Sequence, residues 1–463
     1  MSTSKPVKER VTTIGEGGSR FWLYPAKFSG AWLNRRRWVA YILIVIFFIT
    51  PWTKVNGHQT ILMDLTERKL SLFGWIFWPQ DTLIFWCFLV GTVIAIFLIT
   101  AWWGRLWCGW ACPQTVFLEH VFRRIETWIE GDANQRRRLD KGPLTFTKFR
   151  KKALKYFVFL IIASHFANTV LCYFVGTEKV LKMTFQPPSQ NWGWFVFMAF
   201  FNFLFFLDFT WFREQFCLIA CPYGRFQSAL LDQHSMIVAY DPNRGEPRQT
   251  FRKDQDRSNI GSCIDCNRCV AVCPTGIDIR HGLQMECINC TACIDACDEI
   301  MEKTHQPKGL IRYTSIADLE GIARRFLRPR VIAYSLLLVV LWGSGTYLLT
   351  HQQPLRIQLL RPRGSSFTLA ESESVISNHF HAKATNQSDQ TWVLKPSVPE
   401  GYEVVTAFSP WTIPPQKTAE NQIFIRKTAS NFSKEGKETV SVTFYQDKVA
   451  VFTNEVTLIG PQK

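Results

Sequence analysis

Eight cysteines between residues 263 and 297 have the type and spacing of a redox centre. They form the pattern C-x2-C-x2-C-x3-C twice within 35 residues. Two such runs are typical of bacterial proteins with two 4Fe-4S clusters, in which the fourth cysteine of each run binds the other cluster. We therefore predict two clusters, one on Cys263, Cys266, Cys269 and Cys297 and the other on Cys273, Cys287, Cys290 and Cys293.

A pair of structural zinc sites is the alternative for these eight cysteines. Zinc sites collect their four ligands as two separated pairs, so two runs of four cysteines fit them poorly. The runs differ in one respect, because Pro274 follows the first run and Asp298 follows the second. This difference removes a turn former and not a ligand, so the iron–sulfur interpretation stands.

Four further cysteines lie in a repeated motif of another kind. Each copy is an aromatic residue followed by C-x3-C-P. If the motif is helical, its two thiols lie on one helix face, and thiolates are ligands that suit Cu(I). A third iron–sulfur cluster and a purely structural turn are the alternatives. Covalent haem is disfavoured because C-x-x-C-H is absent. We predict as catalytic residues and copper ligands Cys108, Cys112, Cys217 and Cys221.

Five apolar segments should position these motifs, at about 38–52, 82–103, 156–176, 192–212 and 331–350. A helix of roughly 20 residues crosses the ~30 Å hydrocarbon core, and the last four segments reach that length. The first segment is shorter. The preceding Arg35, Arg36 and Arg37 are predicted to snorkel toward the interface. The composition agrees with a membrane protein, since 47% of residues are hydrophobic and 14% are aromatic.

The distribution of Lys and Arg predicts the orientation. The N-terminal segment, loop 104–155 and region 213–330 are rich in them, whereas loops 53–81 and 177–191 carry three and two. By the positive-inside rule, the N-terminus and the cysteine runs face the cytoplasm and residues 351–463 face the periplasm. The run Arg136–Arg138 is then a lipid-facing or topology signal. The net charge of +16 therefore needs no nucleic-acid partner.

The last hundred residues predict a different fold. Short alternating stretches at 422–426, 440–445 and 449–453 are separated by turn residues, which is typical of an all-β sandwich. The predicted organisation has five parts: a cytoplasmic tail (1–37) that is mostly flexible over residues 1–30, a four-span membrane region (38–230), a cytoplasmic ferredoxin domain (231–330), a fifth transmembrane helix (331–350) and a periplasmic immunoglobulin-like sandwich (351–463).

With these features in place, the chain resembles the cytochrome c oxidase accessory proteins of the CcoG/FixG/RdxA type. The double ferredoxin run and the C-terminal sandwich belong to the resemblance. So do four stretches: Phe73-Gly74 with Trp78-Pro79-Gln80-Asp81, Gly104-Arg105 with Trp107-Cys108-Gly109-Trp110-Ala111-Cys112-Pro113-Gln114-Thr115, Ile129-Glu130-Gly131-Asp132, and Cys217 with Cys221-Pro222-Tyr223-Gly224-Arg225-Phe226-Gln227. The membrane ferredoxins of nitrate and nitrous-oxide respiration share the paired C-x3-C-P motifs, but they are not expected to carry the C-terminal domain.

The resemblance implies a bacterial inner-membrane polyferredoxin that reduces Cu(II) to Cu(I) for assembly of a cbb-type oxidase. The implied partners are oxidase assembly factors or a copper transporter or chaperone, together with an electron donor that the sequence does not identify. Two other functions stay open. One is a quinone-linked electron-transfer subunit, and the other is a redox-signalling or assembly scaffold.

Overall fold

Two units make up the chain, Met1–Thr346 and Tyr347–Lys463. The computed structural model describes residues 13, 20–65, 69–78, 81–250, 260–364, 367–370, 375–388, 390–433 and 435–461. Pro79 and Gln80, which belong to the motifs of the resemblance, lie outside the described residues.

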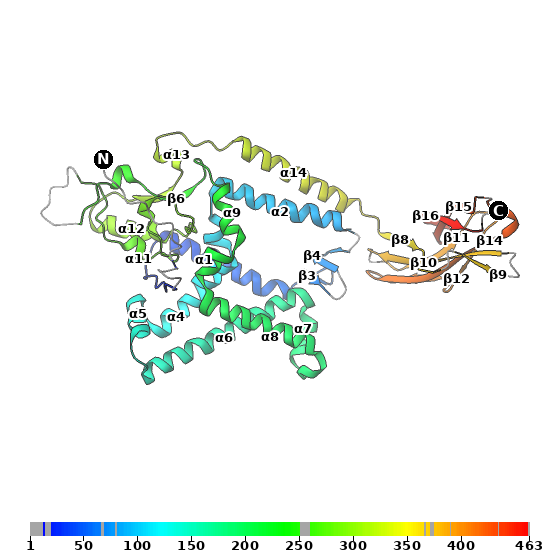
Figure 1. Cartoon of the computed structure of the whole chain (residues 1–463), viewed down its shortest axis with the longest axis horizontal. Helices are drawn as coiled ribbons and strands as arrows, with labels where there is room; N and C mark the ends of the chain where they lie inside the picture. Colours follow the sequence, from blue (N-terminus) through cyan, green and yellow to red (C-terminus); the bar gives the residue numbers. More distant parts are fainter. Residues whose placement is uncertain are drawn as a thin grey trace. The chain divides into compact units, whose positions relative to one another are not determined.

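Four helices in the described part are long and apolar enough to cross a membrane. They are Thr82–Trp103, Phe146–Val175, Pro188–Phe212 and Pro329–Thr350. The first, second and fourth of these are α2, α6 and α14. The third consists of the turn η6 (Pro188–Asn191), the helix α8 (Trp192–Leu207) and the turn η7 (Asp208–Phe212). Helices α2 and α14 lie side by side, as do α6 and α8 (Figure 1).

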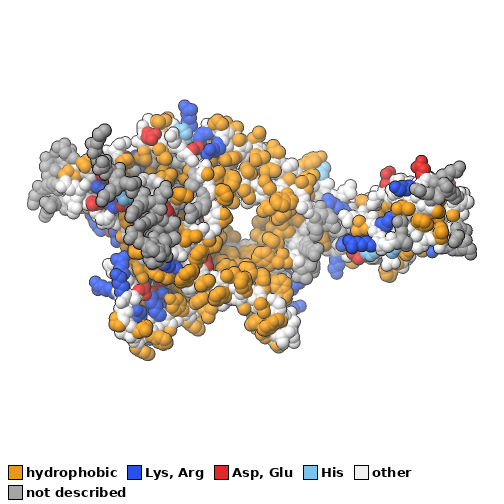
Figure 2. Space-filling model, in the orientation of Figure 1, with side chains coloured by type: hydrophobic (Ala, Val, Ile, Leu, Met, Phe, Trp, Pro, Cys, Tyr) orange, Lys and Arg blue, Asp and Glu red, His pale blue; other side chains and the backbone are white. Residues whose placement is uncertain are grey.

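Large apolar side chains cover the outside of these helices. No residue of α8 is buried, and Leu83 of α2 and Val339 of α14 are 65% and 70% exposed. Figure 2 shows hydrophobic side chains spread over the surface of the helical unit. Soluble proteins rarely expose an apolar surface of this extent. The prediction of a polytopic helical membrane protein is thereby confirmed.

The segment predicted as the first span lies in α1 (Ala31–Ile49) and the following turn η2 (Thr50–Trp52). Its arginines leave an apolar stretch shorter than those of the other four helices. Arg36 does not snorkel, because it is 3% exposed and donates from Nη1 to the carbonyl oxygen of Cys290 at 3.1 Å. The snorkelling prediction is therefore wrong for Arg36.

The segment before α1 is ordered where the structure describes it. The N–H of Ala26 donates to the carbonyl of Ala271 at 2.8 Å, and the hydroxyl of Tyr24 donates to Oδ2 of Asp140 at 2.7 Å. These contacts hold residues 20–30 against the cysteine runs and the loop 104–155. The prediction of a mostly flexible tail is wrong for this part.

Short helices and small sheets connect the spans. The helical elements are η4 (Trp107–Ala111), α3 (Pro113–Phe117), η5 (Leu118–Phe122), α4 (Arg123–Glu130), α5 (Ala133–Lys141), α7 (Thr177–Thr184), η8 (Phe216–Ala220) and α9 (Pro222–Leu230). Between η2 and α2 lie two antiparallel sheets, formed by β1 (Lys54–Val55) with β2 (His58–Gln59), and by β3 (Ile61–Asp64), β4 (Lys69–Leu72) and β5 (Trp75–Phe77).

The cysteine runs lie in a small α+β region after α9. Strand β6 (Ile237–Tyr240) pairs antiparallel with β7 (Ile311–Thr314), so Tyr240 lies opposite Ile311. The helical elements of this region are α10 (Pro242–Gly245), α11 (Arg268–Ala271), η9 (Ile279–His281), α12 (Ala292–Lys303) and α13 (Ile316–Leu319). The core includes Val238, Ile277 and Ile294, which are all buried.

The second unit is a two-layer sandwich. One sheet has the order β12 (Glu403–Thr406), β14 (Thr418–Thr428), β10 (Val375–Asn386) and β8 (Leu355–Leu360), with β9 (Thr368–Ala370) paired to β10. The other has the order β13 (Trp411–Ile413), β11 (Trp392–Ser397), β15 (Lys437–Gln446) and β16 (Val449–Ile459). Ile423 and Ile425 of the first sheet and Val442 and Phe444 of the second are 0% exposed in one shared core. The predicted all-β sandwich is confirmed. The short turn η10 (Ala429–Asn431) follows β14.

Candidate metal centre

Both ferredoxin-type cysteine runs use the same left-handed backbone. The residues on either side of the second cysteine have positive φ in each run: 51° at Asp265 and 55° at Asn267, and 53° at Asn289 and 65° at Thr291. A β-branched residue such as threonine rarely adopts this conformation, and such strain is concentrated at functional loops. The two runs therefore form two copies of one loop.

Two small cavities lie within this region. The first is bordered by Cys263, Cys266, Cys269 and Cys297. The second is bordered by Cys269, Cys273, Cys287, Cys290 and Cys293. Cys293 and Cys297 are one turn apart on α12, so one helix supplies thiols to both cavities.

The surroundings of these cavities fit iron–sulfur clusters. Thiolate is the ligand that holds such clusters, and apolar side chains such as Ile277 and Met301 form most of the remaining lining. Burial raises the pKa of Cys287 to about 12 and that of Cys290 to about 11. These thiols therefore need a bound metal to stay deprotonated at neutral pH.

The two C-x3-C-P motifs fold as π turns, η4 and η8, and not as α-helices. In each turn the N–H of the second cysteine donates five residues back, from Cys112 to the carbonyl of Trp107 and from Cys221 to that of Phe216, both at 2.8 Å. The helices that follow, α3 and α9, both begin with proline. Since π turns are rare and are frequent at functional sites, their matched use makes the sequence repeat a structural repeat.

The residue after each C-P pair reaches across to the other copy of the motif. Gln114 donates from Nε2 to Oδ1 of Asp208 at 3.2 Å and to the carbonyl of Arg213 at 3.1 Å. The hydroxyl of Tyr223 shares a hydrogen bond of 2.7 Å with Oγ1 of Thr100. Thr100 and Asp208 precede the first and second motifs, so this exchange holds the two motifs together.

Neighbouring thiols of the repeat influence the protonation of Cys108, Cys112 and Cys217. Burial raises the pKa of Cys108 to about 12, and negative charge on Cys112 and Cys221 adds to the rise. Burial, and then Cys112, Cys108 and Cys221, also raise the pKa of Cys217. A metal ion that binds here must displace protons. Within the described ranges, no three His, Cys, Asp or Glu side chains converge as ligands of a single ion.

The first motif packs on the loop of the second ferredoxin run. Cys108 packs against the apolar cluster that contains Cys290. A Cβ added to Gly109 would lie 2.5 Å from the carbonyl oxygen of Ile288, so only glycine permits this approach of the two backbones. The two cysteine centres are therefore in direct contact.

Hydrogen bonds reinforce this contact. Arg105, which is 5% exposed, donates from Nη1 to the carbonyl oxygen of Cys287 at 3.0 Å. The indole N–H of Trp110 donates to the hydroxyl of Tyr313 at 3.2 Å, and that hydroxyl donates to the carbonyl of Asn289 at 3.0 Å. Arg105 thus binds the backbone before Ile288 directly, and Trp110 reaches the backbone after Ile288 through the hydroxyl of Tyr313.

A buried ion-pair network fastens the loop 104–155 to the second motif. Its described members are Glu119, Glu126, Glu130, Asp140, Glu214, Arg20, Arg123, Arg136, Lys152, Lys155 and Arg213. Glu126 accepts from both Nη atoms of Arg213 at 3.0 Å and from Nη1 of Arg136 at 2.9 Å. Burial alone would raise the pKa of Glu126, but Arg213 and Lys155 lower it well below its usual range.

The run Arg136–Arg138 is not uniformly exposed. Arg136 is 3% exposed and pairs with Glu126, whereas Arg137 and Arg138 are exposed. The prediction that this run faces lipid is therefore wrong for Arg136, and its role as a topology signal stays a prediction. Its guanidinium joins α5 to α4.

Sequence reasoning missed several residues that position the centres: Arg36, Arg105, Gly109 and Tyr313. The two arginines look like topology signals beside an apolar span. A glycine between the two cysteines of a motif is a usable signal, because such glycines often mark a close approach of two backbones. No pattern in the sequence marks Tyr313.

Three family models match the chain. Residues 82–132 match a "4Fe-4S binding domain", residues 212–316 match a "4Fe-4S dicluster domain", and residues 345–461 match the "IG-like fold at C-terminal of FixG". The first match contains the first C-x3-C-P motif, and the second contains the second motif and both ferredoxin-type runs. Iron–sulfur binding is thereby supported.

Several curated proteins are similar to the chain. The nitrogen fixation protein FixG of Rhizobium meliloti is 35% identical over 64% of this chain, and the match spans 57% of that protein. Protein RdxA of Cereibacter sphaeroides is 34% identical over 80% of each chain. Protein RdxB of the same organism is 32% identical over 87% of this chain and 88% of its own length.

One solved structure, a FixG-related protein from Vibrio parahaemolyticus, is 13% identical. It aligns with 24% of this chain and 99% of its own, with a TM-score of 0.20.

Proposed function

The chain belongs to the FixG/RdxA family, and we propose that it reduces Cu(II) to Cu(I) for the assembly of a cbb-type cytochrome c oxidase. It is a membrane iron–sulfur electron-transfer protein. The observation that carries the proposal is the packing of Cys108 against the group of buried apolar side chains that contains Cys290. This contact joins a thiol site near the ends of two spanning helices to the ferredoxin-type runs.

We propose the ligand sets that the spacing predicts. One 4Fe-4S cluster has as ligands Cys263, Cys266, Cys269 and Cys297. The other has Cys273, Cys287, Cys290 and Cys293. The grouping of these thiols around two cavities supports both sets. Such clusters supply one-electron transfer when bound, and the chain's own residues bury them and position their loops.

Copper is the proposed substrate, bound at Cys108, Cys112, Cys217 and Cys221. Reduction of Cu(II) takes one electron, which suits a one-electron relay. The product Cu(I) prefers soft thiolate ligands. The electrostatic influence of the neighbouring thiols on Cys108 and Cys217 supports the site, although the four half-buried thiols would have to move closer together to bind one ion. A third iron–sulfur cluster is the second candidate for these thiols, which the family match of residues 82–132 favours.

The proposed setting is the bacterial inner membrane. The excess of Lys and Arg on one set of loops supports a cytoplasmic N-terminus and ferredoxin region, with the sandwich in the periplasm. Oxidase assembly factors, or a copper transporter or chaperone, are the proposed partners.

A Cu(I)-specific chelator tests the copper step. The purified full chain, reduced under argon and freed of reductant, should convert added Cu(II) to chelated Cu(I). The double variant Cys108→Ser/Cys217→Ser should lose most of this rate, while the control Cys87→Ser/Cys172→Ser, at the two cysteines outside the motifs, should keep it. An unchanged rate in the first variant would refute the thiol site.

Iron analysis separates copper from a third cluster. Two 4Fe-4S clusters predict about 8 iron atoms per chain, and three predict about 12. A value near 12 that falls by about 4 in Cys108→Ser/Cys217→Ser would assign the outer thiols to a cluster and not to copper.

A further inference from the structure

A basic cavity lies beside the second ferredoxin run, apart from both cysteine centres. It has a volume of about 270 Å³ and is bounded by the segment before α1, the start of α1, η5, α4, α5 and the loops near Val272 and Ala292. Glu119 is the only carboxylate among its described lining residues. Six cationic side chains border it: Lys27, Arg36, Arg37, Arg123, Arg124 and Arg136.

Several of these side chains are buried with unused donors. Arg36 and Arg123 are 3% and 6% exposed, and the Nε of each has no hydrogen-bond partner in the described part of the chain. His120 is 6% exposed, and its Nε2 is likewise unpartnered there. A buried polar group without a partner is costly, by roughly 1–3 kcal/mol and more when charged. A ligand of opposite charge in the cavity would stabilise this cluster.

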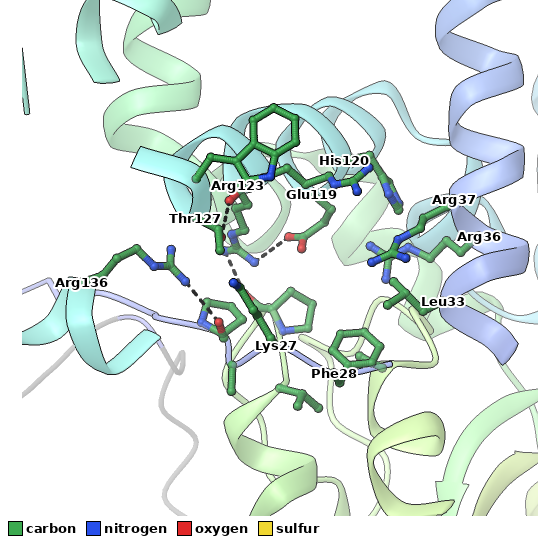
Figure 3. A pocket seen from close by; sticks show the side chains of 17 residues that line it. Lys27, Phe28, Leu33, Arg36, Arg37, Glu119, His120, Arg123, Thr127 and Arg136 are labelled. Carbon is green, nitrogen blue, oxygen red and sulfur yellow. Dashed lines mark hydrogen bonds and ion pairs between the residues drawn. The ribbon is translucent and has the colours of Figure 1, made fainter. Parts of the chain in front are cut away.

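The ligand must be an anion, because the cations of the cavity exceed the carboxylates. Arg123 pairs with Glu119 at 2.6 Å and with Glu214 at 2.9 Å. Among the described residues, no carboxylate forms an ion pair with Lys27, Arg36, Arg37 or Arg124. In Figure 3, Lys27, Arg36 and Arg123 extend toward the same space from three different segments.

The geometry points to a phosphate group as the ligand, carried by an anionic phospholipid or by free pyrophosphate, and we propose this site. Guanidinium groups match phosphate oxygens with paired donors. The cavity is smaller than the roughly 300–1,000 Å³ of pockets that enclose whole cofactors, so it suits a phosphate with the rest of the molecule outside. Basic pockets at the cytoplasmic ends of spanning helices are typical sites for anionic head groups.

The rim of the cavity supports an amphipathic ligand. Trp128 and Phe28 both line it, and Trp128 is 76% exposed. Tryptophan is enriched where membranes meet water. An apolar chain attached to the phosphate could therefore lie along Trp128.

Two of the arginines connect this site to the two ferredoxin-type runs, Arg123 at the end of the first run and Arg36 within the second. Arg123 donates from Nη2 to the carbonyl of Pro274 at 3.3 Å, and Arg36 donates to that of Cys290 at 3.1 Å. A bound phosphate adds negative charge beside these loops, so it should lower the reduction potential there. This consequence rests on the proposed cluster ligands. Binding itself does not, so a failure of copper reduction leaves the binding test valid.

The test uses the full chain, purified in detergent and depleted of lipid. Calorimetry measures inorganic pyrophosphate binding, and native mass spectrometry after reconstitution measures retention of phosphatidylglycerol against phosphatidylcholine. The variant Lys27→Gln/Arg37→Gln removes two accessible cations and should weaken binding about tenfold or more. The control Arg35→Gln/Arg138→Gln removes two exposed arginines that do not line the cavity and should bind like the wild type.

Each outcome decides the proposal. Pyrophosphate binding that the first variant alone loses supports the site with a soluble ligand. Selective phosphatidylglycerol retention that the first variant alone loses supports it with a lipid head group. Absence of both kinds of binding overturns the proposal, as does equal loss in the two variants. If bound ligand leaves the midpoint potential of the wild-type iron–sulfur centres unchanged, the proposed effect of the phosphate on that potential is overturned.

Discussion

Replacement of Glu126 by glutamine should strongly destabilise the part of the membrane unit where the loop 104–155 meets the second C-x3-C-P motif. Its carboxylate accepts three hydrogen bonds from Arg213 and Arg136 at 2.9–3.0 Å, and Nζ of Lys155 lies 3.5 Å away. Each 3 Å pair is attractive by about 5–6 kcal/mol at an effective dielectric constant near 20, and desolvation offsets much of this. Removal of the carboxylate leaves the cations buried without it, which costs about 3–5 kcal/mol.

Thermal unfolding in detergent measures this effect. We expect Glu126→Gln to lower the unfolding temperature on the order of 10 °C, since 1 kcal/mol corresponds to about 2–4 °C in a domain of 150–250 residues. The control is Glu178→Gln, whose carboxylate pairs with Lys54 at 2.6 Å on the surface and should change little because water and salt screen such pairs. Equal shifts in the two variants would refute the stabilising role of the buried network.

Three further predictions follow from the same structure. Gly109→Ala should push the first motif away from Ile288 and broaden the electron paramagnetic resonance signal of the neighbouring centre, whereas Gly343→Ala, which meets nothing within 4 Å, should not. The stability difference between wild type and Glu126→Gln should stay constant at about pH 5–8. This difference should shrink as the pH falls from the pKa of Glu126 in the unfolded chain, about 4.5, toward its lower pKa in the folded protein. Pulse proteolysis at a series of pH values measures it. Cys266 is the one exposed cysteine of the ferredoxin-type runs, so a mild oxidant should remove iron first from the cavity that Cys266 borders. Mössbauer spectroscopy can follow this loss, and loss from the other cavity first would contradict the predicted order.

Local patterns in the sequence predicted much of the fold. Apolar length marked the four spanning helices, and alternation marked strands such as β14 and β15, because both depend on neighbouring residues. The same holds for the repeated loops around Cys266 and Cys290, whose spacing alone indicates a shared backbone. The ligand sets and the copper site stay predictions.

Long-range pairing could not be predicted. The sequence alone predicts that Arg36 and Arg136 are exposed charges near the membrane interface, but both are buried in the structure. The partner of Arg36 lies 254 positions away, in a backbone carbonyl that any residue type would supply. The spacing C-x3-C likewise fits an α-helix and a π turn equally, and the choice depends on which carbonyl the second cysteine reaches.

Stopped-flow mixing of the reduced protein with Cu(II) tests the central claim most directly. The full chain would be reduced anaerobically, freed of excess reductant and mixed with Cu(II) while the iron–sulfur absorbance and Cu(I)–chelator absorbance are recorded together. The proposal predicts that the iron–sulfur centres are reoxidised as one Cu(I) appears per electron, and that Cys108→Ser/Cys217→Ser slows both signals equally. Reoxidation at the wild-type rate in that variant, or reoxidation without Cu(I), would contradict it.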